Sequence, residues 1–148
     1  MMISMTREEK HLKTFITISA IAYFAVGCAF VIAPEMIFNA INAFSRIIMP
    51  NLEEIPISVE KFWLSMTFSM MMTITALSYI AQHNVRKNKG YIIPLLISKS
   101  ASALSALCFF IFSDRYFAYI VIFLVDGSIF WITLFFYLRA NKAFFESQ

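Results

Sequence analysis

Four long apolar runs dominate this sequence, and each contains 20 or more residues. A helix needs about 20 residues to cross the hydrocarbon core of a bilayer, which is roughly 30 Å thick. Only helices and closed barrels satisfy their backbone polar groups in lipid, and the runs lack the two-residue alternation of barrel strands. We therefore predict an all-α, four-helix transmembrane bundle that forms one integral membrane domain over residues 1–148. The predicted membrane helices cover residues 14–33, 62–82, 91–112 and 116–138.

The composition excludes a water-soluble fold of this size. Hydrophobic residues make up 60% of the chain and charged residues 14%, whereas soluble domains are about 45–50% apolar and about 25% charged. The net charge of +3 gives no reason to expect a nucleic-acid partner, because the basic residues fall at helix ends, where membrane topology explains them. The expected partners are the lipid bilayer and either a second membrane protein or further copies of this chain in a homo-oligomer.

The distribution of Lys and Arg predicts the orientation of the chain. Basic residues gather before the first helix, between the second and third, and after the fourth: Arg7, Lys10, Lys13, Arg86, Lys87, Lys89, Arg139 and Lys142. The opposite side has only Arg46, Lys61 and Arg115. Because the side richer in Lys and Arg normally stays in the cytoplasm, we expect both termini there, in a multi-pass protein of the inner (plasma) membrane.

The segment 34–61 is the one sizeable stretch outside the predicted spans, and its first half reads as a short amphipathic helix over 35–48. Pro34 suits the start of a helix. Apolar residues recur at helical spacing on one face: Ile37, Ile41, Phe44 and Ile48. The other face is polar, with Glu35, Asn39, Asn42 and Arg46. This pattern favours a helix lying flat on the outer membrane surface, and a helix that caps the bundle mouth or docks on a partner is the alternative.

Two charges lie inside the predicted membrane helices. Lys99 is about 12 Å into the third helix and Asp126 about 15 Å into the fourth, at about 1.5 Å per residue. The short turn at 113–115 makes these helices antiparallel neighbours, so the two residues differ in depth by only about 4.5 Å. We predict an intramembrane ion pair between Lys99 and Asp126. Such a pair either marks a site for a substrate, ion or proton or only fixes how the two helices pair.

Small and polar residues surround this pair. Ser98 and Ser102 flank Lys99 on the third helix, and Ser69 with Thr73 gives the second helix a polar stripe. Small residues let helices approach closely, so close packing with hydroxyls bonded back to the helix is one interpretation. The other is a polar cavity that holds a small anion or a quinone headgroup. Glu60 is a candidate residue at the outer mouth, although its place in a first helical turn, where it favours the helix dipole, is sufficient to explain it.

No motif in the sequence indicates catalysis or a metal. There is no glycine-rich phosphate loop and no supported catalytic triad, and the cysteines form no metal-binding pattern. The two histidines, His11 and His83, fall at helix ends, whereas a bis-histidine haem needs two at membrane depth. We assign no catalytic or metal-binding residue and predict no cofactor, with quinone as the one candidate.

The first membrane helix closes with Gly27-Cys28-Ala29-Phe30-Val31-Ile32-Ala33-Pro34-Glu35. With about 150 residues and four short-looped helices, this pattern resembles the DoxX-like group of small bacterial membrane proteins, in which a glycine, a phenylalanine and a proline close helix one. The resemblance implies a four-helix fold and, for some of that group, a link to quinone-coupled sulfur oxidation. It implies nothing about Lys99 or Asp126.

Two hypotheses for function follow. The first is a non-enzymatic subunit or accessory component of a larger membrane assembly, since the chain is small, has little mass outside the membrane and has no catalytic set. The second is a small carrier or quinone-interacting protein that uses the Lys99–Asp126 centre. Purification in mild detergent distinguishes the two hypotheses, because the first predicts a larger complex and the second a lone chain with a bound molecule.

Overall fold

The computed structural model describes residues 5–56 and 61–145, in which helices alternate with short loops and no strand occurs. Four of its helices are long and apolar enough to cross a membrane, so the chain is a small polytopic membrane protein with the all-α fold predicted. A fifth helix connects the first two spans, and a short 3-10 turn, η1, precedes the third. The elements are α1 (Arg7–Ile32), α2 (Pro34–Ile48), α3 (Lys61–His83), η1 (Lys89–Tyr91), α4 (Ile92–Phe112) and α5 (Phe117–Phe145).

Two helices extend well beyond the apolar runs that predicted them. α1 begins at Arg7 because Thr6 forms a capping box with Glu9: the Thr6 hydroxyl accepts from the Glu9 backbone, and the Glu9 carboxylate accepts from the Thr6 backbone. α5 continues past residue 138 to Phe145. An apolar run marks only the part of a helix that lipid must cover, and polar turns prolong the helix outside it. For α3 and α4 the predicted limits differ from the structure by one residue at most.

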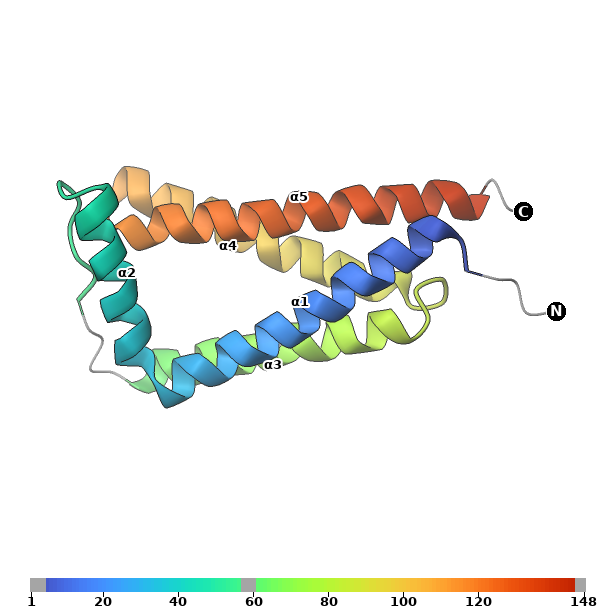
Figure 1. Cartoon of the computed structure of the whole chain (residues 1–148), viewed down its shortest axis with the longest axis horizontal. Helices are drawn as coiled ribbons and strands as arrows, with labels where there is room; N and C mark the ends of the chain where they lie inside the picture. The colour runs from blue at the N-terminus through green and yellow to red at the C-terminus, as the bar shows by residue number, and fades with distance from the viewer. Residues whose placement is uncertain (1–4, 57–60, 146–148) are drawn as a thin grey trace.

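The membrane helices form two antiparallel pairs, α1 with α3 and α4 with α5 (Figure 1). Both chain termini lie at one end of the bundle, here called the terminal end. The two pairs come together near the terminal end and diverge toward the opposite end, where α2 lies across them (Figure 1). We call that opposite end the α2 end.

Buried apolar side chains follow the same asymmetry. The largest core cluster joins residues of α1, α3, α4, α5 and the loop after α3, toward the terminal end: Leu12, Ile16, Ala81, Val85, Ile92, Leu96 and Ala140. A smaller cluster farther along consists of Tyr23, Ile74 and Leu95. The cluster that joins all four membrane helices therefore lies toward the terminal end, and the two pairs diverge toward the α2 end (Figure 1).

The connecting helix α2 contacts α1 and α5 and so links the two diverging pairs. Its position agrees with either predicted placement, because a helix lying across the bundle end also lies flat at the membrane surface. Phe44 and Ile48 of the predicted apolar face are exposed, whereas Asn42 of the predicted polar face is buried. Asn42 is buried because it forms hydrogen bonds with a neighbouring stretch of backbone. The backbone of Ile55 folds back against α2, and buried backbone groups need partners, which Asn42 supplies.

Candidate functional site

Lys99 of α4 and Asp126 of α5 meet in the middle of the bundle. The Lys99 Nζ atom lies 2.8 Å from Asp126 Oδ1, and both side chains are largely shielded, with 11% and 14% of their surfaces exposed. The same ammonium lies 4.7 Å from the centre of the Tyr23 ring on α1, a distance typical of a cation–π contact. Lys99 therefore links the α4–α5 pair to α1 near the point where the two helix pairs separate.

The short turn between α4 and α5 brings this pair together. α4 ends at Phe112 and α5 begins at Phe117, so the two helices must run back along each other. Ala103 on α4 is buried, and a Cβ built at Gly127 would lie 3.9 Å from the Ala103 Cβ. Small residues at this contact let the helix backbones approach closely, which places the Lys99 and Asp126 side chains within hydrogen-bonding distance.

A groove of about 710 Å³ opens beside the ion pair, between α3 and α4. Its residues come from α3, α4 and α5: Thr67, Met70, Met71, Ile74, Pro94, Ile97, Ser98, Lys99, Ala101, Ser102, Ser105 and Asp126. Met70 and Ile97, on opposite walls, are 60% and 61% exposed. The groove therefore opens sideways, toward the surface that faces lipid, and Lys99 with Asp126 provides its charged part.

The structure sorts the predicted polar residues into two groups. Ser98 and Ser102 line the groove beside Lys99. Ser69 and Thr73 do not line the groove, contrary to the prediction. Both are exposed, and the Thr73 hydroxyl donates to the Ser69 carbonyl at 2.9 Å.

Helix geometry explains why the prediction chose the wrong face of α3. At about 100° per residue, the groove-lining residues Thr67, Met70, Met71 and Ile74 share one face, and Ser69 and Thr73 fall on the opposite side. Thr67 is thus the α3 hydroxyl that lines the groove. The candidate outer-mouth residue Glu60 lies outside the described residues.

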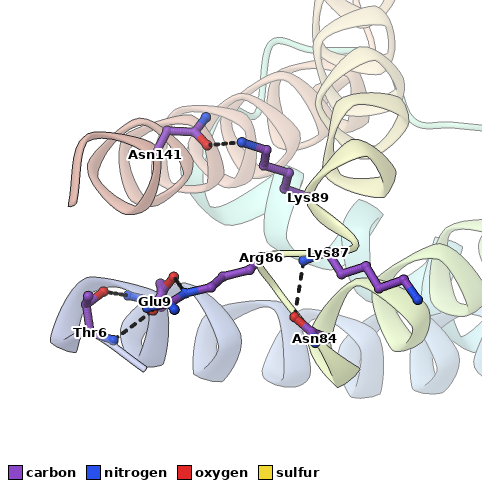
Figure 2. A network of polar contacts seen from close by, with 7 residues as sticks. All are labelled: Thr6, Glu9, Asn84, Arg86, Lys87, Lys89 and Asn141. Atoms are coloured by element: carbon purple, nitrogen blue, oxygen red, sulfur yellow. Dashed lines mark hydrogen bonds and ion pairs between the residues drawn. The ribbon is translucent and has the colours of Figure 1, made fainter. Parts of the chain in front are cut away.

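A second ion pair, which the sequence analysis did not predict, lies at the terminal end (Figure 2). Glu9 on α1 is 1% exposed, and Arg86, in the loop after α3, forms a two-pronged salt bridge with it, in which Arg86 Nη2 donates to Glu9 Oε2 at 2.8 Å. The Thr6 backbone N–H donates to the same oxygen at 2.7 Å. The spacing of Thr6 and Glu9 in the sequence indicates the capping box that positions the Glu9 carboxylate.

The loop from α3 to α4 therefore contacts both terminal helices. Arg86 reaches α1, and Lys89 Nζ donates to Asn141 Oδ1 of α5 at 3.4 Å (Figure 2). Hydrogen bonding to Glu9 raises the pKa of the Arg86 guanidinium above its ordinary value, so this contact stays charged at any physiological pH. We call the Glu9–Arg86 and Lys89–Asn141 contacts the terminal clasp. The clasp connects this loop to α1 and α5 beside residues of the largest core cluster.

The groove offers an ammonium, a carboxylate and serine hydroxyls within an apolar wall, and the metal-ligand types His, Cys, Asp and Glu form no group of three or more among residues 5–56 and 61–145. Comparison with known proteins adds no assignment: no protein-family model, no curated protein and no solved structure matches this chain. The resemblance to DoxX-like proteins stays a prediction, and the groove itself is the basis for inferring function.

Proposed function

We propose that this chain is a non-enzymatic membrane protein whose groove between α3 and α4 binds a small amphiphilic molecule from the bilayer. The observation that carries this proposal is the groove of about 710 Å³ with Lys99 and Asp126 in its wall. Small-molecule sites occupy about 300–1,000 Å³ and combine an apolar lining with a few placed polar groups. Both descriptions fit this groove.

The cost of the charged pair supports a binding role. A charge at the bilayer centre costs roughly 2.5–3.5 kcal/mol on insertion scales, and pairing offsets only part of that cost. Helices α4 and α5 already pack through Ala103 and Gly127, so they do not need the ion pair to stay together. A ligand that hydrogen bonds to Lys99 or Asp126 would explain why the charged pair lies beside an open groove.

The DoxX-like resemblance suggests a quinone as one such ligand. Its carbonyl oxygens would accept hydrogen bonds from Lys99, and its ring would lie against the apolar wall formed by Met71 and Ile74. Extraction of the purified protein with organic solvent, followed by mass spectrometry, tests this directly. We expect a stoichiometric amphiphile from the natural chain and its loss from Ser102→Phe, which fills the groove. A natural chain without any bound amphiphile contradicts the proposal.

A role as a subunit or accessory component is the second candidate, and one observation favours it. On α4, Ala101 and Ser105 are exposed between the larger side chains Ile97 and Leu104. Exposed small residues on a membrane helix allow another helix to pack closely. A partner helix, from another protein or a second copy, would then lie over the groove. Light scattering of the protein purified in mild detergent decides between a lone chain and a larger assembly.

The proposed location is the plasma membrane, with both termini and the terminal clasp in the cytoplasm. The eight Lys and Arg residues at the terminal end, against three at the α2 end, support this orientation. Single cysteines in a background without Cys28 and Cys108 test it. In intact cells, a membrane-impermeant thiol reagent should label a cysteine at Asn39 on α2 and spare one at Lys142. The reverse labelling pattern contradicts the orientation.

A further inference from the structure

The charge balance of the groove restricts which ligands it accepts. Among the residues that the structure describes, Lys99 and Asp126 are the charged ones that line it, and their charges cancel at 2.8 Å. A ligand with a net charge that approaches one of them meets a like charge on the other, in surroundings where neither water nor salt screens the repulsion. The groove therefore favours a ligand without net charge.

The donors and acceptors that Lys99 and Asp126 leave unused indicate which ligand headgroup would fit the groove. A lysine ammonium has three N–H donors, and within the described residues Asp126 Oδ1 is the one hydrogen-bond acceptor of Lys99 Nζ. No hydrogen bond to Asp126 Oδ2 forms within the same residues. In an apolar environment an unused donor or acceptor is costly. A headgroup that accepts from Lys99 and donates to Asp126 satisfies both atoms.

The walls of the groove define the rest of the ligand. Met70, Met71 and Ile74 form the α3 side, and Pro94 with Ile97 forms part of the α4 side. Because Met70 and Ile97 are exposed at the rim, an apolar chain attached to a bound headgroup would extend past them into the bilayer. This arrangement suits a molecule with one polar head and one flexible apolar tail.

We infer that the groove binds uncharged amphiphiles whose headgroup carries both a hydrogen-bond acceptor and a hydroxyl donor, in preference to fatty acids or amines with the same chain. This inference depends on the proposed function and specifies its ligand class. The acceptor lies at Lys99, the hydroxyl at Asp126, and the tail runs between Met70 and Ile97. Monoacylglycerols have this chemistry, with an ester carbonyl and free hydroxyls.

Native mass spectrometry of the purified full chain in detergent tests the inference. The probes are monoolein, oleic acid and oleylamine at equal concentration, which share one hydrocarbon chain and differ in headgroup charge. We expect monoolein to be retained about tenfold more than either charged probe, which corresponds to about 1.4 kcal/mol. Lys99→Met and Asp126→Asn should each reduce monoolein binding.

A matched pair of variants keeps the test informative if the charge variants fold poorly. Ser102→Phe fills the groove and keeps both charged side chains of the ion pair, and Thr73→Phe adds the same ring to the exposed, opposite side of α3. Monoolein binding should be lost in Ser102→Phe and kept in Thr73→Phe. If oleic acid or oleylamine is preferred and Ser102→Phe abolishes that binding, the inferred ligand class is wrong and the proposed function stands. If no probe binds, the inferred ligand class is wrong, and the solvent extraction described above decides the proposed function. If Ser102→Phe leaves binding intact, both are wrong.

Discussion

Lys99 holds its ammonium 4.7 Å above the ring of Tyr23, which is 5% exposed, so a charged group of α4 lies directly against α1. Since Lys99 also pairs with Asp126 on α5, three of the four membrane helices meet at one ammonium group. The contact lies at the limit of the dense core, beyond which the helix pairs diverge (Figure 1). Changes at Lys99 should therefore affect both stability and the groove beside it.

Removing one member of the central ion pair should be more harmful than removing both. Lys99→Met leaves the Asp126 carboxylate without its partner, and breaking a buried pair in this way costs about 3 kcal/mol or more. The double variant Lys99→Met/Asp126→Leu leaves no uncompensated charge and should recover most of the stability. Thermal unfolding in detergent measures both, with Lys87→Met, at an exposed lysine, as the control. Equal losses in the single and double variants would show that the carboxylate does not need Lys99.

The two glycines at helix contacts should respond oppositely to alanine. A Cβ at Gly27 would lie 2.9 Å from Met71 Cβ and 3.0 Å from Met72 Cε, so Gly27→Ala must push α1 and α3 apart, at about 1–3 kcal/mol. A Cβ at Gly127 meets only an ordinary contact at 3.9 Å. Gly127→Ala should be neutral or stabilise by up to about 1 kcal/mol through helix propensity. Thermal unfolding of the two variants side by side checks this, and equal effects contradict the packing described.

The pairing of Lys99 with Asp126 could be predicted from sequence because a short turn fixes the register of two adjacent helices. The packing of α1 on α3 could not, because lipid-facing and helix-facing side chains are both apolar and leave no polarity pattern to read. Ser69 and Thr73 were misplaced for a related reason. A hydroxyl that bonds back to its own helix, as Thr73 does, tolerates lipid, so a polar stripe on a membrane helix does not identify its inner face.

The terminal clasp should contribute measurably to stability through Glu9. Glu9→Gln removes the carboxylate that binds Arg86 and weakens the capping box of α1, so we expect a lower unfolding temperature than for Lys10→Met, a change at the neighbouring exposed position. Glu9→Leu combined with Arg86→Met should be less harmful than Glu9→Leu alone, because the guanidinium then no longer lies against an apolar leucine side chain. Additive effects of the two substitutions would show that the side chains are not coupled.

The attachment of α2 should depend on Asn42 and not on its exposed neighbour Asn39. Asn42 Nδ2 donates to the Ile55 carbonyl at 3.0 Å, and the Ile55 N–H donates to Asn42 Oδ1 at 2.9 Å. Asn42→Ala removes both bonds and should cost about 1–3 kcal/mol, since the Ile55 backbone loses its partners. Asn42→Asp should fail as well, because a carboxylate cannot donate to the Ile55 carbonyl.

Hydrogen exchange at the Ile55 amide measures this attachment directly. We expect fast exchange in Asn42→Ala and Asn42→Asp, and the natural rate in Asn39→Ala, whose side chain is exposed on the same helix. Because α2 joins the two diverging helix pairs at this end of the bundle (Figure 1), its release should also widen the space between α3 and α4. A slow Ile55 amide in Asn42→Ala would mean that other contacts hold the segment to α2.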